Sequence, residues 1–449
     1  MQEFAMPQSP TKSPGKKIVV DPHLTRRAVS YQGNKTSPGF RWLKFKEGFS
    51  ASLVESLLSI SGGKSVLDPF SGAGTTILTA CKMGKRSVGM DVMPISEKMV
   101  GVMDSAAHVS INDVRDAADG IMLSMKGSGD GIPFEHLRIT RGAFPPRTER
   151  ELSRARHAIK SIGDESIKNI INFAVMSVLE EVSYTRKDGQ FLRWDPRSGR
   201  DVAAVLDKGR LPLLNKAFEM KIKQIIEDMP HVKSAYAGPR PVARTESSLK
   251  ALRKMKPRSI DAVVTSPPYA NRYDYTRTYA LELAWMGYSE TGISALRQAM
   301  LTATVENRPK GEWLAKVYGR SSLPGEAADV CAKNRRLQSA LKYLKRHAAE
   351  LNNPHIIRLV ENYFAEMAVI IAELGRIVRK NGNVFMVNDN VRYHGMDIPV
   401  DIILSEFAEK SGFTCESIRA LPRGKGNSSQ QMGKFGRSEL RKCIYRWKR

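Results

Sequence analysis

The sequence is poor in cysteine, with four residues in 449. No two of them form a Cys-x-x-Cys pair, and histidines that could complete a zinc site, such as His347, His355 and His394, are scattered along the chain. We therefore expect no metal site. The cysteines, which we expect to be reduced and structural, are Cys81, Cys331, Cys415 and Cys443.

The sequence also lacks long apolar runs. None approaches the roughly 20 residues needed to span a bilayer, and residues 1–10 lack the apolar stretch of a secretory signal. We therefore expect a soluble, intracellular protein with no membrane partner.

Acidic residues are scarce relative to basic ones. The chain has 46 Asp and Glu against 71 Lys and Arg, which gives a formal charge of +25 at pH 7. A surface with so many unpaired cations repels itself unless it meets a polyanion, so nucleic acid is the favoured partner. Hydrophobic residues make up 41% of the chain, enough for a large core. We therefore expect a globular protein.

The first hundred residues divide into an arm and half of an α/β domain. Residues 1–39 are rich in Pro, Ser, Lys and Gly without helical or strand periodicity, which predicts a flexible basic arm. Residues 40–104 are expected to form the first half of the α/β domain, and Ser50 suits the N-cap of the first helix in it. The elements predicted next are a strand at 65–67, a Gly-rich turn, a helix at 75–83 and a strand at 87–90 that ends at Asp91.

Two insertions interrupt the rest of the domain. Residues 105–245 mix helical and basic polar segments, which predicts an inserted domain. Residues 246–449 resume the sheet and contain a second, basic helical insertion at about 290–350. The elements predicted here are strands at 262–265, 383–387, 414–421 and 442–447, and helices at 356–379 and 399–411. This alternation predicts an α/β fold.

The first motif reads Leu-Asp-Pro-Phe-Ser-Gly-Ala-Gly-Thr-Thr over residues 67–76. Ligands of open α/β sheets bind where strands end, and glycines such as Gly72 and Gly74 let the backbone approach them. Asp68 is placed to accept a hydrogen bond from a cationic amine, and Asp91, about 20 residues on, to accept from ribose hydroxyls. The pattern predicts a nucleotide-type cofactor site. The alternative is an ordinary tight turn in a nucleotide-independent α/β protein.

The second motif, Ser266-Pro267-Pro268-Tyr269, follows the strand at 262–265. Its prolines stiffen the loop and remove two backbone donors, so its carbonyls are free to accept from a ligand amine. Ser266 adds a hydroxyl acceptor, and Tyr269 offers a face on which an extruded base can stack. Because Ser-Pro-Pro is also a common loop string, a purely structural loop is the alternative.

Two basic segments are candidate nucleic-acid surfaces. Residues 184–200 interleave cations with Tyr184, Phe191 and Trp194, which suits phosphate pairing and stacking. Residues 297–346 hold eleven Lys or Arg against four acids. Each segment could instead be a solvated charged face. The predicted DNA-binding residues are Arg186, Lys187, Arg193, Arg197, Arg200, Arg335 and Arg336.

Together the motifs resemble those of the DNA amino-methyltransferases. That family combines an Asp-Pro-Phe-x-Gly-x-Gly cofactor loop with a catalytic loop of Asp, Asn or Ser, then Pro-Pro and an aromatic residue. Residues 44–50 also look like the family segment that precedes the cofactor loop, and residues 379–384 and 427–436 resemble later parts of these enzymes. The resemblance covers roughly residues 40–100 and 250–449.

The resemblance implies a Rossmann-like, S-adenosylmethionine-dependent methyltransferase sheet in which 105–245 is the target-recognition region. Its implied partners are duplex DNA and a cognate restriction endonuclease of the same system, and its implied location is the cytoplasm of a prokaryote, in association with the nucleoid. The implied cofactor-binding residues are Lys46, Phe49, Ser50, Asp68, Pro69, Phe70, Gly72, Gly74, Thr75, Thr76 and Asp91. The implied catalytic residues are Ser266, Pro267, Pro268 and Tyr269.

The resemblance also bears on the methylated atom. A serine at the first position of the catalytic loop is associated with the N4 amine of cytosine, and Asp or Asn with the N6 amine of adenine, so Ser266 points to cytosine. Many N4-cytosine enzymes, however, have the catalytic loop first in sequence, unlike this chain. Enzymes of the third kind methylate carbon-5 of cytosine and use a cysteine nucleophile that typically follows a proline. No cysteine in this sequence follows a proline, which disfavours that reaction.

We expect direct in-line transfer to a flipped cytosine, with Ser266 and the Pro267 carbonyl accepting the two amine hydrogens. Three alternatives stay open from the sequence: an N6-adenine DNA methyltransferase, an RNA base methyltransferase, and a DNA-binding protein without catalysis.

Overall fold

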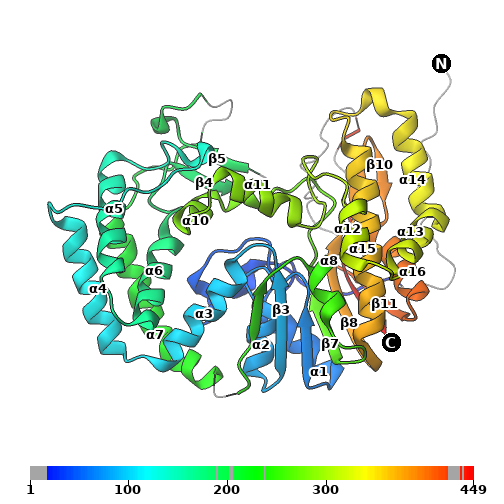
Figure 1. The fold of residues 1–449 in the computed structure, drawn as a ribbon, viewed down its shortest axis with the longest axis horizontal. Coiled ribbons are helices and arrows are strands. Elements are labelled where there is room, and N and C mark those ends of the chain that lie inside the picture. The colour runs from blue at the N-terminus through cyan, green and yellow to red at the C-terminus, as the bar shows by residue number, and fades with distance from the viewer. Residues whose placement is uncertain (1–17, 189–190, 202–205, 237, 423–434, 437–438) are drawn as a thin grey trace.

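The computed structural model of the protein describes residues 18–188, 191–201, 206–236, 238–422, 435–436 and 439–449. Its centre is a sheet of eight strands: β1 (Ile18–Val20), β2 (Ser65–Asp68), β3 (Arg86–Asp91), β6 (Val242–Thr245), β7 (Ile260–Thr265), β8 (Val378–Asp389), β11 (Thr414–Ala420) and β12 (Lys442–Lys448). Their order is β1-β11-β12-β8-β7-β2-β3-β6. Only β12 runs antiparallel to its neighbours. This large, mostly parallel sheet confirms the predicted α/β class (Figure 1).

Helices cover both faces of the sheet because its central strands are apolar on both sides. Val264 of β7 belongs to the apolar cluster of α1 (Ala51–Ser61), whereas Val263 beside it belongs to the cluster of α15 (Ile356–Ile377). α2 (Thr75–Lys82) packs beside α1, and α8 (Ser248–Ala251) and α16 (Val400–Lys410) pack beside α15. No helix among the described residues is long and apolar enough to cross a bilayer.

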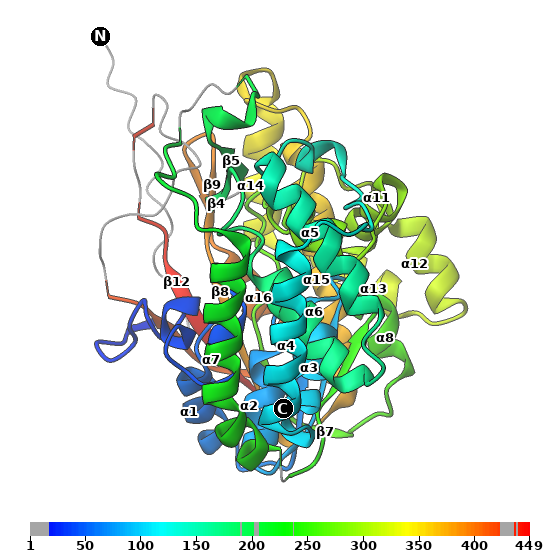
Figure 2. The same ribbon diagram turned by 90° about the vertical axis from the view of Figure 1, so that its left-hand side faces the viewer.

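A helical body is inserted between β3 and β6. It consists of α4 (Ile111–Lys126), α5 (Pro146–Lys160), α6 (Glu165–Val178), the hairpin of β4 (Thr185–Asp188) and β5 (Phe191–Trp194), and α7 (Leu214–Ala235). Figure 2 shows these four helices together on one face of the molecule. The predicted range 105–245 differs from the observed insertion at both ends, because it cuts through α3 (Ile95–His108) at its start and includes a strand of the central sheet, β6, at its end. α3 packs against α6 and α7, and β6 pairs with β3.

A second insertion follows β7 and is helical, as predicted for about 290–350. Its helices are α9 (Tyr275–Thr278), α10 (Ala280–Trp285), α11 (Glu290–Ala299), α12 (Gly311–Tyr318), α13 (Leu323–Lys333) and α14 (Arg335–Arg346). α10 packs against α6 of the first insertion, whereas α13 and α14 pack against α15. α10 and α11 therefore lie between two helical bodies (Figure 1). The hairpin of β9 (Val391–Tyr393) and β10 (Met396–Ile398) contacts α14.

The prediction of a flexible arm over 1–39 is wrong for residues 18–39, and residues 1–17 lie outside the described part. β1 pairs in parallel with β11, which places Ile18 opposite Ile418. Leu24 and Val29 are buried against α1. The Asn34 amide donates to the Phe49 carbonyl at 2.9 Å. The segment is ordered because its few apolar residues complete one edge of the sheet and one apolar cluster.

Candidate cofactor pocket and catalytic loop

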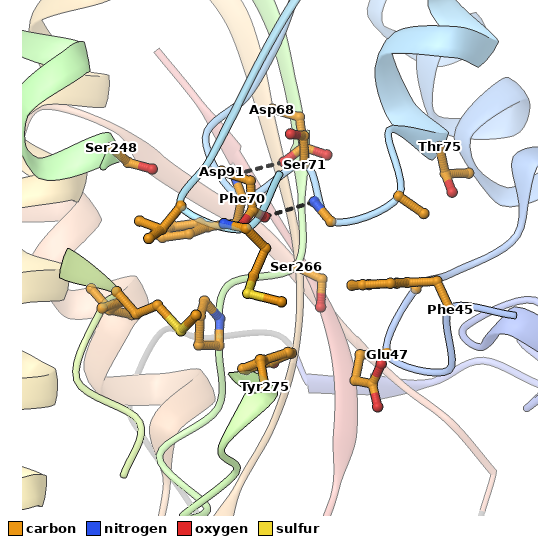
Figure 3. Close-up of a pocket in the computed structure, with 18 of the residues that line it drawn as sticks. Phe45, Glu47, Asp68, Phe70, Ser71, Thr75, Asp91, Ser248, Ser266 and Tyr275 are labelled. Atoms are coloured by element: carbon orange, nitrogen blue, oxygen red, sulfur yellow. Dashed lines mark hydrogen bonds between the residues drawn. The ribbon is translucent and has the colours of Figure 1, made fainter. Parts of the chain in front are cut away.

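A pocket lies at the carboxyl edge of the sheet, where four neighbouring parallel strands end. β2 ends at Asp68, β3 at Asp91 and β6 at Thr245, and Ser266 directly follows β7. Parallel strands present their carboxyl ends at one edge, so side chains from distant parts of the sequence converge there. Figure 3 shows Asp68 and Asp91 on one side of the pocket, Glu47 and Tyr275 on the other, and Ser266 between them.

Asp91 is held in place by the backbone of two loops. Its Oδ2 accepts a hydrogen bond from the Gly72 amide at 2.8 Å, and its Oδ1 accepts from the Met93 amide at 2.8 Å. Gly72 has a φ of +52°, and a Cβ there would lie 2.8 Å from the Phe45 ring. The turn therefore requires glycine. Burial raises the pKa of Asp91 to about 6.

Asp68 connects the Gly-rich turn that follows β2 to the strand that precedes the Ser-Pro-Pro-Tyr loop. Its Oδ1 accepts from the Phe70 amide at 3.0 Å and from the Thr265 hydroxyl at 2.7 Å. The carboxyl is 2% exposed, and burial raises its pKa to about 7. A buried carboxyl with a raised pKa is favoured in its ionised form when a cation binds beside it.

The Ser-Pro-Pro-Tyr loop forms one wall of the same pocket, through Ser266 and Pro268. The Tyr269 hydroxyl lies 3.3 Å from the Ser266 hydroxyl and accepts a hydrogen bond from Lys442 Nζ at 3.1 Å. The Lys442 ammonium also lies 5.1 Å from the centre of the Tyr269 ring and 3.2 Å from Asp389. The last strand of the sheet thus fixes the tyrosine of this loop.

The segment before α1 forms the opposite wall. Phe45 stacks on Tyr279 with ring centres 4.9 Å apart. The Glu47 carboxylate accepts hydrogen bonds from the hydroxyls of Tyr273 and Tyr279. Burial and the adjacent Glu47 charge raise the pKa of both tyrosines, which keeps them neutral donors. This wall therefore depends on side chains that follow the Ser-Pro-Pro-Tyr loop.

Two named methyltransferases align with almost the whole chain. The type II methyltransferase M.AvaI of Nostoc sp. (strain PCC 7120) is 41% identical, with 95% of this chain and 89% of the relative aligned, and the same values hold for M.AvaI of Anabaena variabilis. The chain belongs to the type II methyltransferases. M.BsoBI of Geobacillus stearothermophilus is 39% identical, with 95% of this chain and 88% of the relative aligned. No family model matches the chain, and no solved structure matches it at a significant level.

Of the cofactor residues predicted for this type II methyltransferase, six line the pocket: Phe49, Asp68, Phe70, Gly72, Thr75 and Asp91. The other five are not among the residues that line it. Gly74 precedes α2 with a φ of +77°, and Ser50 caps α1 by accepting from the Leu53 amide at 3.2 Å. The Pro69 carbonyl accepts from Ser248, and the Thr76 hydroxyl donates to the Val264 carbonyl at 3.0 Å. Lys46 donates its ammonium hydrogen to the Lys187 carbonyl.

Several pocket residues of the methyltransferase were not predicted from the sequence. Ser247, Ser248 and Leu249 follow β6, and recognition of β6 as a sheet strand would have placed them at the carboxyl edge. Tyr275, Met300 and Leu301 come from the second insertion, and nothing in their sequence spacing indicates the pocket.

The predicted DNA-binding residues of the methyltransferase fall into different environments. Arg186, Arg193 and Arg335 are exposed. The prediction for Lys187 is wrong, because this side chain is 2% exposed, forms an ion pair with Glu282 and lies 4.3 Å from the Tyr279 ring centre.

The remaining three predicted arginines have partners within the protein. Arg197 pairs with Asp195 at 2.6 Å, and Arg336 pairs with Glu406 at 3.1 Å. Arg200 lies 3.9 Å from the Trp194 ring centre and donates to the Arg138 and Arg141 carbonyls. Arg197 and Arg200 therefore also stabilise the fold of the segment that carries them.

Proposed function

We propose that this type II methyltransferase transfers a methyl group from S-adenosylmethionine to the N4 amine of a cytosine at a specific site in duplex DNA. The observation that carries the proposal is that Ser266 and Pro268 line the same pocket as Asp68 and Asp91. A cofactor loop and an amine-accepting loop from distant parts of the chain thus share one pocket, on a sheet that we take as Rossmann-like.

The residues of the pocket fit S-adenosylmethionine. Asp91 lines the pocket and accepts backbone amides from both loops beside it. A carboxylate has about four acceptor positions, so the capacity that remains suits ribose hydroxyls. Asp68 would accept from the methionyl ammonium, and Phe70, Val92 and Met93 offer apolar surface to the adenine. When bound, S-adenosylmethionine supplies an electrophilic methyl group.

The Ser-Pro-Pro-Tyr loop would orient the target amine. In our proposal the Ser266 hydroxyl and the Pro267 carbonyl accept the two hydrogens of the cytosine amine, which directs the nitrogen lone pair into the pocket. These contacts tighten as the nitrogen becomes tetrahedral, so they stabilise the transition state more than the ground state. The Tyr269 ring would stack on the flipped base.

The two insertions would hold the DNA. The net charge of +25 favours a polyanion. We assign target recognition to the first insertion, which presents Arg186 and Arg193, and phosphate binding to the basic second insertion, which presents Arg335. A cognate restriction endonuclease and a cytoplasmic location near the nucleoid belong to the same proposal.

Identification of the modified nucleoside tests this proposal. Duplex DNA, single-stranded DNA and structured RNA are each incubated with the enzyme and labelled S-adenosylmethionine, digested and separated. N4-methylcytosine from duplex DNA is the expected product. N6-methyladenine would keep the mechanism but overturn the choice of base, and preferential labelling of RNA would overturn the substrate. 5-Methylcytosine, or a covalent adduct with a mechanism-trapping cytosine analogue, would overturn the direct transfer.

A further inference from the structure

Three potential metal ligands that lie apart in the sequence meet at one end of the second insertion. His347 directly follows α14, Glu350 ends the following 3-10 turn (Ala348–Glu350), and His394 lies at the turn of the β9–β10 hairpin. One nitrogen of each histidine and one oxygen of Glu350 all lie within 4.8 Å of one another. The hairpin and α14 are adjacent in the fold (Figure 1).

The hydrogen bond of His347 prepares its other nitrogen for a ligand. His347 Nδ1 lies 3.0 Å from the Tyr343 carbonyl oxygen, so Nδ1 carries the hydrogen and Nε2 carries the lone pair. A histidine that binds a metal is oriented in this way by its second nitrogen. His394 Nε2 lies 3.4 Å from Glu350 Oε2, so the carboxylate reaches the same point.

The backbone at His394 is a second, independent observation. His394 and Gly395 have φ values of +48° and +77°, and Tyr393 pairs directly with Met396, so the hairpin has a two-residue turn with both central residues left-handed. Asn or Gly usually precedes the glycine of such a turn. The side chain there is instead a buried imidazole that faces His347, with ring centres 5.1 Å apart.

We propose that His347, Glu350 and His394 bind one divalent transition-metal ion of the Zn²⁺ type. Two imidazoles and one carboxylate suit Zn²⁺ and its neighbours, whereas Mg²⁺ and Ca²⁺ prefer oxygen ligands alone. Three protein ligands leave a fourth position for water.

The position of this site gives the ion a structural role near the catalytic loop. Tyr393 precedes His394, and its hydroxyl donates to the carbonyl of Ala270, the residue after Tyr269. A metal ion that joins α14 to the hairpin would restrain Tyr393 and, through it, the end of the Ser-Pro-Pro-Tyr loop. This proposal does not depend on which base is methylated.

Zn²⁺ binding by the full-length protein tests the site. Protein stripped with a chelator and dialysed is titrated with Zn²⁺ against a chromophoric indicator, and Co²⁺ is added separately to record its absorption spectrum. We expect one Zn²⁺ per chain that excess Mg²⁺ does not displace, visible d–d bands with Co²⁺, and a higher melting temperature with Zn²⁺.

Matched variants locate the ion. His394→Asn removes the imidazole but keeps a residue that tolerates the left-handed turn, and Glu350→Gln changes an exposed side chain. Each should weaken Zn²⁺ binding at least tenfold and abolish the shift in melting temperature. His355→Asn, an exposed histidine outside the cluster, should bind Zn²⁺ like the unchanged protein.

Zn²⁺ affinity unchanged in both His394→Asn and Glu350→Gln would place the ion elsewhere and overturn the proposal. Absence of any Zn²⁺ or Co²⁺ binding would also overturn it and leave His347 and His394 as members of an aromatic stack with Tyr343. Circular dichroism of the metal-free variants separates loss of the site from loss of the fold.

Discussion

Asp91 is the residue whose removal should affect the cofactor most directly. Its carboxylate fixes the Gly72 turn and faces the pocket. Asp91→Ala should weaken S-adenosylmethionine binding by about 1.5 to 3 kcal/mol, the range for a hydrogen bond to a charged group. Calorimetric titration measures the change, with Asp119→Ala as a control on the exposed face of α4. Equal affinity in a folded Asp91→Ala protein would contradict the assignment.

The pKa of Asp68, raised to about 7 by burial, predicts a pH dependence. In the free protein the folded pKa lies above the unfolded value of 3.8. The contribution of Asp68 to the free energy of unfolding is therefore fully present below about pH 4 and is lost as the pH rises through about 7.

Cofactor binding should show the opposite trend, because the methionyl ammonium pairs with the ionised carboxylate. S-adenosylmethionine affinity should rise as the pH increases from about 6 to about 8, and Asp68→Asn should remove this rise. Calorimetry across the pH range tests it. The same slope in Asp68→Asn would assign the titration to another group.

Two variants of Tyr269 test the proposed catalytic loop and distinguish base stacking by its ring from hydrogen bonding by its hydroxyl. Tyr269→Ala should lose about 1 to 3 kcal/mol of base stacking, and methyl transfer should fall accordingly while cofactor affinity stays near normal. Tyr269→Phe keeps the ring but loses the contacts of the hydroxyl with Lys442 and Ser266. Single-turnover rates of the two variants give the comparison. Wild-type transfer by Tyr269→Ala would show that the base does not stack on this ring.

At the scale of elements, the sequence predicted the regular core well. Strands with apolar runs, such as β7, were predicted within a few residues of their observed bounds, and the predicted N-cap of α1, Ser50, is confirmed. β1 and β6 were missed because they are short and lie at the two edges of the sheet, where one flank is unpaired. Because β6 was not predicted, the pocket residues that follow it, Ser247, Ser248 and Leu249, were not predicted either.

Local charge patterns were a weaker guide than the pocket motifs. Asp68 and Asp91 were predicted because strand ends are defined by the sequence itself. Lys187 was not predicted to be buried, since its partner Glu282 comes from the second insertion and only the tertiary fold brings the two charges together.

The N-terminal segment makes a testable contribution to stability. Leu24 is 5% exposed within the cluster that contains α1. Leu24→Ala should lower the free energy of unfolding by about 2 to 5 kcal/mol, the range for a large-to-small change in a core. Val20→Ala on the exposed side of β1 is the control, since Val20 is 58% exposed. Denaturant unfolding should show a clear loss for Leu24→Ala alone; similar curves would mean that the segment adds little stability.

At the scale of the whole molecule, the two insertions should make separable contributions to DNA binding. Arg335→Ala should weaken binding to all sequences alike and reduce the slope of log K against log salt by about one unit. Arg186→Ala should change which sequences are methylated. Binding titrations at several salt concentrations and sequencing of methylated sites measure the two effects. A changed target preference in Arg335→Ala, with none in Arg186→Ala, would reverse the assignment.

The order of strands also bears on how a ribosome can deliver this protein. β12 follows both β8 and β11 in the sequence but lies between them in the sheet, and β1, which precedes the other strands, pairs with β11. The parallel strands β2, β3, β6, β7 and β8 can therefore pair with one another while synthesis continues, but β8 lacks its second neighbour until β12 has been made. A nascent chain would expose the flank of β8 throughout that interval, and an unpaired strand flank favours aggregation.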